Sequence, residues 1–288
     1  MTPDTARPPA GSSGLGVAAP HGDAMPIRAA LEHMIAVTYG FAYDAVVTRF
    51  EPYEKLLTDV ADLVGRAAAG VENRRAVRVL DIACGIGNVS LRIAKEGYTV
   101  VGIDAVRHLI AIAREKHHAA ALPNLTFHHL DLARDPLPGS GTFDVLVSMH
   151  TLYWHPDPPA LLEGCRRALK PGGHAVFLTY GRPAYVGRTY RDIRAQEGTG
   201  AALRALRWLV PTAIFETSRD CAQRYLSEAE FHATLTAGGF EVLESRQTFL
   251  AGLSHLAWVR VRGDAAAAGA AGGDARQSGA DPGVGRGG

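Results

Sequence analysis

A strand, a glycine turn, a helix and a second strand constrain this chain more than any other feature. An apolar run rich in β-branched residues, 77–82, is followed by Gly85 and Gly87 with one residue between them. Apolar residues then resume at helical spacing, and a second apolar run, 98–103, ends on Asp104. This pattern predicts strand, tight turn, helix and strand. Asp104 can accept two hydrogen bonds from a ribose diol, and the glycines let backbone N–H groups approach a ligand closely.

Two classes of ligand use this geometry. A dinucleotide site requires a third glycine that packs the helix against the strand beside the pyrophosphate, and this chain has Ser90 at that position. Asp81 lies on the first strand just before the turn, where it can accept a hydrogen bond from an ammonium group or orient the loop. A nucleoside that carries an amino acid therefore fits the pattern better than a dinucleotide.

The block from Val79 to Asp104 resembles the cofactor site of class I S-adenosylmethionine-dependent methyltransferases. Three further blocks, residues 131–132, 143–150 and 166–173, extend the resemblance in the order and spacing of that family. Among these enzymes the chain is most similar to the small-molecule type that includes the ubiquinone and menaquinone C-methyltransferases. The resemblance implies an α/β fold, with a seven-stranded, mostly parallel sheet, helices on both faces and an antiparallel C-terminal hairpin.

The resemblance also implies S-adenosylmethionine as the cofactor and assigns residues to it. In this assignment Asp131 accepts a hydrogen bond from the adenine amino group, and the alternative is that Asp131 caps a turn. The expected cofactor contacts are Tyr39, Asp81, Ala83, Cys84, Gly85, Gly87, Asn88, Asp104, Ala105, Asp131, Leu132 and Met149.

One domain, residues 24–262, is expected between two tails that are rich in small residues and predicted to be disordered, 1–23 and 263–288. Two segments of the domain should cover the site. These are a helical cap, residues 24–70, and an inserted substrate lid of two helices, residues 181–224.

Aromatic and basic residues of the cap and the lid are candidates for contact with the ligands. Tyr39 and Tyr43 stand one helical turn apart, so both can face one side of the cap, or both can simply pack it against the core. Arg182 opens the arginine-rich lid and can recognise an anionic group, whereas most lid arginines should be solvated or paired with acids.

Histidines and aromatic residues follow the apolar strand 143–149, where ligands bind in open α/β sheets. His150 is the best-placed titratable side chain, and its ordinary pKa of about 6.5 suits a general base or a substrate-positioning group. The alternative is that His150 only makes local hydrogen bonds. His155 and Tyr39 are the next candidates for the catalytic base. The expected substrate contacts are Tyr43, Tyr153, Tyr180 and Arg182.

The composition of the chain limits the classes of partner and the cellular location that we expect. With 30 basic and 29 acidic residues, the net charge of +1 supplies no field that would attract nucleic acid or an anionic membrane. The start of the chain does not resemble a signal peptide, and no apolar run reaches the roughly 18 residues of a membrane span. Three widely spaced cysteines argue against a disulfide framework or a zinc site. We expect a cytoplasmic, metal-free protein that acts on a small molecule, with a homodimer as an open alternative.

The predicted activity is in-line transfer of a methyl group from the sulfonium of S-adenosylmethionine to N, O or C of a small acceptor, as the resemblance implies. A bacterial biosynthetic pathway is the expected setting. Two alternatives are kept. An NAD-dependent oxidoreductase is disfavoured by Ser90, and a non-catalytic protein would keep the nucleoside site and bind a partner through its lid.

Overall fold

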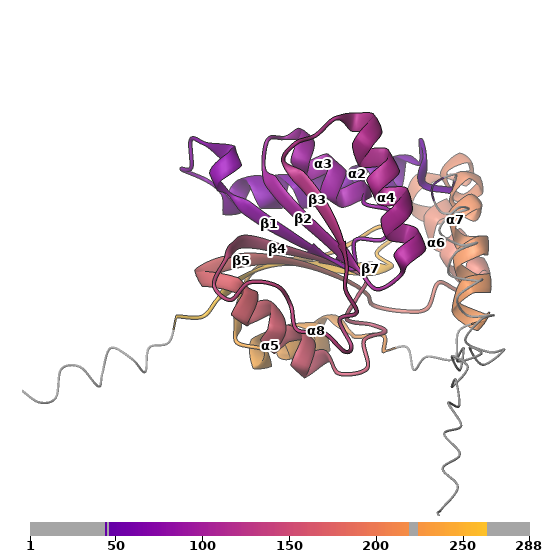
Figure 1. Cartoon of the computed structure of the whole chain (residues 1–288). Helices are drawn as coiled ribbons and strands as arrows, with labels where there is room; N and C mark the ends of the chain where they lie inside the picture. The colour runs from indigo at the N-terminus through magenta and orange to yellow at the C-terminus, as the bar shows by residue number, and fades with distance from the viewer. Residues whose placement is uncertain (1–43, 45, 219–223, 264–288) are drawn as a thin grey trace, which may run out of the picture.

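The computed structural model describes residue 44, residues 46–218 and residues 224–263, which form a seven-stranded sheet with helices on both faces (Figure 1). The strand order is β3-β2-β1-β4-β5-β7-β6. The first five strands are parallel, and β7 is antiparallel to both β5 and β6. The predicted sheet and its C-terminal hairpin are confirmed. The strands are β1 (Arg78–Ile82), β2 (Thr99–Asp104), β3 (Leu125–His129), β4 (Phe143–Met149), β5 (Leu169–Tyr180), β6 (Phe240–Thr248) and β7 (Ser254–Val261).

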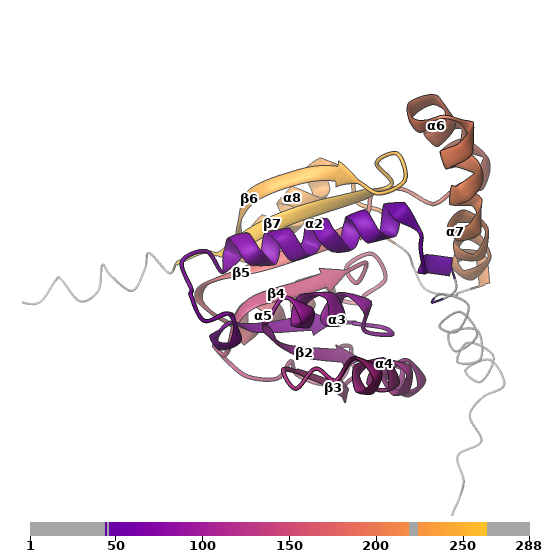
Figure 2. The same ribbon diagram turned by 90° about the horizontal axis from the view of Figure 1, so that it is seen from above.

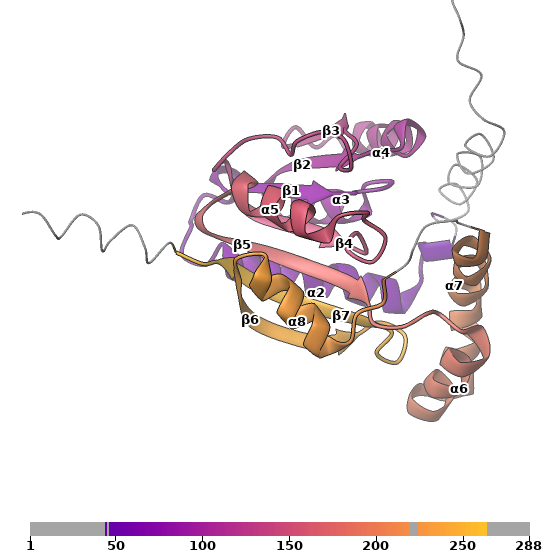
Figure 3. The ribbon, with the colours of Figure 1, turned by 90° about the horizontal axis from the view of Figure 1, so that it is seen from below.

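Helices cover both faces of the sheet. In Figure 2, α2, α3 and α4 lie over one face, and in Figure 3, α5 and α8 lie over the other. The mostly apolar character of β1 and β4 follows from this arrangement, because parallel strands covered on both sides bury most of their side chains. The helices are α2 (Glu51–Ala67), α3 (Asn88–Lys95), α4 (Arg107–Ala120), α5 (Pro158–Ala168), α6 (Val186–Glu197), α7 (Thr199–Ser218) and α8 (Glu228–Ala237), with a 3₁₀ turn at Arg74–Ala76.

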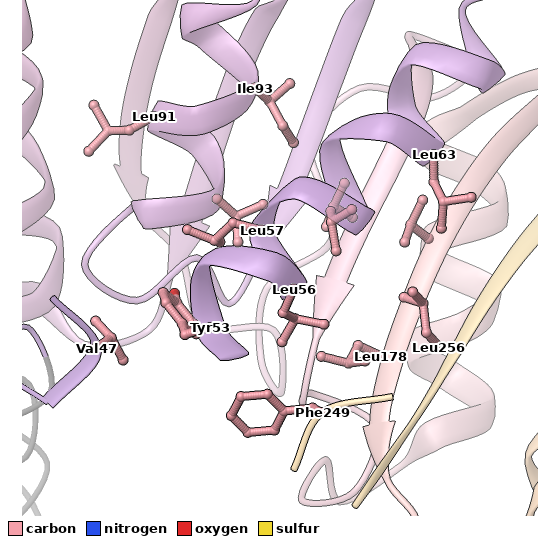
Figure 4. Close-up of a cluster of buried hydrophobic side chains, with 14 of the residues drawn as sticks. Val47, Tyr53, Leu56, Leu57, Leu63, Leu91, Ile93, Leu178, Phe249 and Leu256 are labelled. Carbon is pink, nitrogen blue, oxygen red and sulfur yellow. The ribbon is translucent and has the colours of Figure 1, made fainter. Parts of the chain in front are cut away.

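Helix α2 belongs to the core. Pro52 lies in the first turn of α2, where a backbone N–H has no partner within the helix, so the N–H that proline lacks is not missed. The apolar stripe of α2 packs onto the sheet. Figure 4 shows Leu56 of α2 beside Leu178 of β5 and Leu256 of β7. This half of the predicted cap therefore stabilises the sheet. The other half, up to residue 43, lies outside the described residues.

The predicted lid contains two helices, α6 and α7, which stand beyond the carboxyl ends of the parallel strands (Figures 1 and 2). Trp208 of α7 is 2% exposed and anchors the helix to the sheet. Its ring centroid lies 4.9 Å from that of Phe249 in an edge-to-face contact and 6.1 Å from that of Tyr180 at the end of β5. The segment predicted to be the lid is thus packed against the strand ends through aromatic side chains.

Replacing Gly87 by alanine is expected to destabilise the protein by about 2–4 kcal/mol. Gly87 has φ +79°, and an added Cβ would lie 2.5 Å from the ring of Phe127 and 3.1 Å from the Cβ of Ala113. Gly85→Ala is the matched control, because Gly85 also has positive φ (+56°) but open space around an added Cβ. Denaturant unfolding compares the two variants. Equal destabilisation would show that the contact with Phe127 is not the cause.

Candidate active site

A cavity of about 360 Å³ opens where the strand order reverses, between the carboxyl ends of β1 and β4. Open α/β sheets bind ligands at such a switch point, because the loops that leave the two strands diverge there. Most of the residues predicted for the site line this cavity. They are Asp81, Ala83, Cys84, Gly85, Asn88, Asp104, Ala105, Leu132, Met149, His150, Tyr153 and Tyr180.

Gly87 and Asp131 are not among the residues that line the cavity. Gly87 faces Phe127 of β3, so its place in the glycine turn serves packing of α3 against the sheet. Asp131 accepts a hydrogen bond from the backbone N–H of Ala133 (3.0 Å) and lies 3.4 Å from Arg134. These contacts are those of a residue that caps a turn, which is the alternative role considered for Asp131 in the sequence.

His155 and Arg182 are also held away from the cavity by local bonds. The ring nitrogens of His155 lie 2.8 and 3.4 Å from the backbone carbonyls of Asp157 and Leu132. The guanidinium of Arg182 donates to the Thr189 hydroxyl (2.9 Å) and pairs with an acid of α6 (3.2 Å). These bonds engage the side chains within the fold. Tyr39 and Tyr43 lie outside the described residues.

Asp104 connects the two turns at the rim of the cavity. One oxygen of its buried carboxylate accepts the N–H of Gly85 (2.9 Å) and the other accepts the N–H of Val106 (2.8 Å). Burial raises the pKa of Asp104, while these two backbone N–H groups oppose the shift. Each oxygen keeps a further lone pair, so the carboxylate can hold the glycine turn and still accept hydrogen bonds from a diol.

Asp81 is buried at the floor of the cavity, with 1% of its surface exposed. It accepts a hydrogen bond of 2.5 Å from the hydroxyl of Ser90. Burial raises the pKa of Asp81 to about 7, and the neighbouring charge of Asp104 adds to the shift. Ser90, which replaces the third glycine of a dinucleotide site, thus supplies the hydrogen bond that orients this acid.

The electrostatics of the cavity favour a cationic ligand. Among the described residues that line it there are two acids, Asp81 and Asp104, and neither lysine nor arginine. A positive ligand would stabilise both carboxylates in their charged form, whereas the pyrophosphate of a dinucleotide would meet two buried negative charges. S-adenosylmethionine carries a sulfonium and an ammonium group, so the residues present fit this cofactor.

An aromatic wall closes the other side of the cavity. The ring of His150 stacks on Tyr180 with centroids 3.8 Å apart, and Tyr153 meets Tyr180 edge to face at 4.9 Å. His150 has φ +55° where the chain leaves β4, and its N–H donates to the Leu178 carbonyl (2.7 Å). Burial lowers the pKa of His150 to about 3, so the imidazole is neutral near pH 7.

Seven of the described residues that line the cavity were not predicted for the site, and two of them, Tyr53 and Thr212, carry hydroxyl groups. The other five are Ile86, Val89, Val106, Leu109 and Trp154. Tyr53 follows Pro52 in the apolar stripe of α2, and Asn88 donates a hydrogen bond of 3.4 Å to its hydroxyl. The stripe indicated core packing, which Tyr53 also provides. Thr212 follows Pro211 in a mostly apolar stretch of α7, and this isolated polar residue was the available signal.

Residues 51–245 match a family model described as a methyltransferase domain. This is more than half of the chain. The chain belongs to the methyltransferase family. The predicted class I, S-adenosylmethionine-dependent type is confirmed, and the strand order and the cavity described above fit that cofactor.

Relatives of this methyltransferase include two ubiquinone biosynthesis O-methyltransferases. The enzyme from Cronobacter sakazakii is 28% identical over 178 residues, which are 57% of this chain and 72% of that protein. The enzyme from Vibrio parahaemolyticus is 35% identical over 105 residues, 36% of this chain and 44% of that protein. The chain spans about half the length of several curated relatives that it matches. Their names specify O-methylation, whereas the sequence resemblance was drawn to the C-methylating type.

A solved structure shows the same fold. Magnesium protoporphyrin IX methyltransferase from Synechocystis PCC 6803, with bound SAH, aligns with a TM-score of 0.56 over 81% of this chain and 99% of that one. The sequences are 16% identical, so the likeness concerns the fold alone.

Over residues 46–218 and 224–263, no helix combines the length and the apolar character that a membrane crossing requires. In the same part of the chain, no three His, Cys, Asp or Glu side chains are grouped so that they could hold a metal ion.

Proposed function

We propose that this methyltransferase transfers the methyl group of S-adenosylmethionine to a hydroxyl of a small molecule in a biosynthetic pathway. The observation that carries the proposal is the pairing of two buried acids with an aromatic wall in one cavity. The acids suit the cationic cofactor, and the wall suits an organic acceptor beside the methyl group. The names of the relatives favour oxygen over nitrogen or carbon as the acceptor atom.

The cofactor side of the cavity would be divided between the two acids. In our proposal Asp104 accepts the ribose hydroxyls, Asp81 faces the ammonium group, and the backbone at Gly85 approaches the amino-acid part closely. Leu132 and Met149 supply apolar surface for the nucleoside. Tyr39 stays a candidate for closing the site.

The sulfonium already makes the methyl group electrophilic, so the protein mainly has to align donor and acceptor and exclude water. As the new C–O bond forms, the S–C bond breaks and its electron pair stays on sulfur, while the hydroxyl proton leaves. His150 is our candidate for receiving that proton. Burial keeps the imidazole of His150 neutral near pH 7, so a ring nitrogen without a proton can accept a hydrogen bond from the acceptor hydroxyl.

The first test is thermal unfolding of the full chain with S-adenosylmethionine, S-adenosylhomocysteine, NAD(H) and ATP in parallel. A ligand that binds only the native state at about 100 times its Kd raises the unfolding free energy by about 3 kcal/mol. We expect stabilisation by the first two ligands alone, followed by transfer of labelled methyl to phenols in a panel that also contains amines and activated carbons. Stabilisation by NAD(H) alone would support the oxidoreductase alternative.

The same panel distinguishes the third alternative. Binding of S-adenosylhomocysteine without transfer to any acceptor would favour the non-catalytic, partner-binding protein. The cytoplasmic location and the homodimer stay predictions. Size-exclusion chromatography tests the homodimer.

A further inference from the structure

Two buried polar atoms without hydrogen-bond partners belong to residues that line the candidate active site. Within the described part of the chain, neither Nδ1 of His150 nor Oγ1 of Thr212 has a partner, and both residues line the cavity. Buried polar atoms in native proteins are nearly always hydrogen-bonded, because an unpaired one loses its water without compensation. Both atoms belong to residues that line one cavity, so a ligand in this cavity is a candidate for supplying the missing bonds.

Thr212 belongs to α7, the second helix of the predicted lid, and lines the cavity. Trp208 lies one helical turn before Thr212 and contacts Tyr180, whose ring stacks on His150. The aromatic contacts that anchor α7 therefore direct the Thr212 face of the helix toward the His150 side of the cavity. Thr212 is only 3% exposed, so bulk water does not supply the hydrogen bond that its hydroxyl lacks.

The hydroxyl of Thr212 does not use the bond that a helical threonine usually makes. Such hydroxyls often donate to the carbonyl four residues earlier. Thr58 does so to Glu54 (3.0 Å), and Thr234 does so to Glu230 (2.7 Å). Among the described residues Thr212 has no such partner, which leaves a hydrogen bond of its hydroxyl for a ligand to make.

The surroundings of this pair define the ligand chemistry. Tyr153, Trp154 and Tyr180 present aromatic surface, which suits a flat ring. No lysine or arginine is found among the described residues that line the cavity, so a carboxylate or phosphate on the ring would lack a counter-ion.

We propose that Thr212 is a specificity-determining residue which, with His150, selects an uncharged aromatic substrate by holding its acceptor hydroxyl. The proposal rests on the function proposed above and deepens it. The substrate oxygen accepts a hydrogen bond from the Thr212 hydroxyl and donates its own proton toward Nδ1 of His150. Its remaining lone pair attacks the methyl group, the S–C electron pair goes to sulfur, and the hydroxyl proton passes to Nδ1.

Phenol and toluene, which have nearly the same shape, serve as probes. Each is titrated into the full chain saturated with S-adenosylhomocysteine, and the ratio of the two Kd values measures recognition of the hydroxyl. We expect Thr212→Val to reduce the preference for phenol about tenfold, the loss typical of one hydrogen bond. Thr212→Ser should retain the preference, and His150→Phe should reduce it further. Thr58→Val, on the core helix α2, is the matched control and should leave the ratio unchanged.

Several outcomes would overturn the proposal. They are a wild-type protein without preference for phenol, a preference that survives Thr212→Val, and failure of both probes to bind at millimolar concentration. Failure of the proposed function is distinguishable, because it would be seen as no binding of S-adenosylhomocysteine in the same samples. The two probes are then titrated into the chain alone, and the ratio still tests Thr212.

Discussion

Asp104→Ala is expected to lower the affinity for S-adenosylmethionine about 100-fold or more, as truncation of a buried, hydrogen-bonded charge commonly does. The carboxylate of Asp104 holds the N–H groups of Gly85 and Val106, so its loss releases the glycine turn as well as the proposed ribose contact. Isothermal titration of the folded variant measures the affinity. Circular dichroism of the same sample establishes that it is folded.

Asp131→Ala is the matched control for this experiment. The resemblance assigned Asp131 to the adenine amino group, but its side chain accepts the N–H of Ala133 in a turn outside the cavity lining. We expect its substitution to weaken cofactor binding less than about fivefold, the effect of one exposed hydrogen bond. An unchanged affinity in Asp104→Ala would disprove the ribose assignment, and a large loss in Asp131→Ala would restore the adenine contact.

Asp81→Asn is expected to stabilise the ligand-free protein at pH 8. The pKa of Asp81 is about 7 in the folded protein and ordinarily 3.8. Because the folded state favours the protonated acid, the stability that this group contributes is fully present below about pH 4 and is lost as the pH rises through about 7. Asparagine stays neutral and can still accept the hydrogen bond of Ser90. A shift of this size corresponds to about 4 kcal/mol, so we expect a gain of about 2–4 kcal/mol at pH 8.

Denaturant unfolding at pH 5 and pH 8 measures this effect. The advantage of Asp81→Asn over the wild type should grow between the two values of pH, whereas Asp62→Asn, an exposed acid on α2, should show no such growth. A constant difference at both values would mean that Asp81 is not the titrating group.

Asp81→Asn should also weaken binding of the cofactor. In the wild type the ammonium group of S-adenosylmethionine would draw Asp81 into its charged form, so binding below about pH 7 should release a proton and affinity should rise with pH. In Asp81→Asn this pH dependence should disappear. The affinity should fall about tenfold or more, because a charge-assisted hydrogen bond is lost. Titrations in buffers with different ionisation enthalpies count the released protons. Equal pH dependence in both proteins would contradict the role of Asp81.

The two acids illustrate what a local pattern can predict. Asp104 is the last residue of β2, and Asp81, opposite Gly102, lies one residue before the end of the parallel neighbour β1. Once the two apolar runs were assigned to adjacent strands, the side chains at their carboxyl ends had to meet at one edge of the sheet. The burial of the two acids and the size of the pKa shift at Asp81 did not follow from the pattern, because both depend on how completely the packed structure excludes water.

His155, Arg182 and Asp131 illustrate what a local pattern leaves open. Each has a residue type and position that suit a site, and each is engaged by a partner within 23 residues in the chain. A pattern of residue types does not specify whether a side chain turns toward a cavity or toward its own loop. That choice depends on the rotamers and backbone angles that the packed neighbours allow.

The sequence by itself indicated the glycine turn, the two strands that flank it and the two acids, because strand periodicity and turn chemistry act over a few residues. The seven-stranded sheet was implied by the resemblance to the family, and the structure gave its strand order. Only the tertiary structure decided which face of the lid meets the site. Thr212 lies 62 positions after His150, and the contact of Trp208 with Tyr180 brings the two residues to one cavity. Packing between segments so far apart depends on shape and side-chain volume, and no spacing in the chain records it.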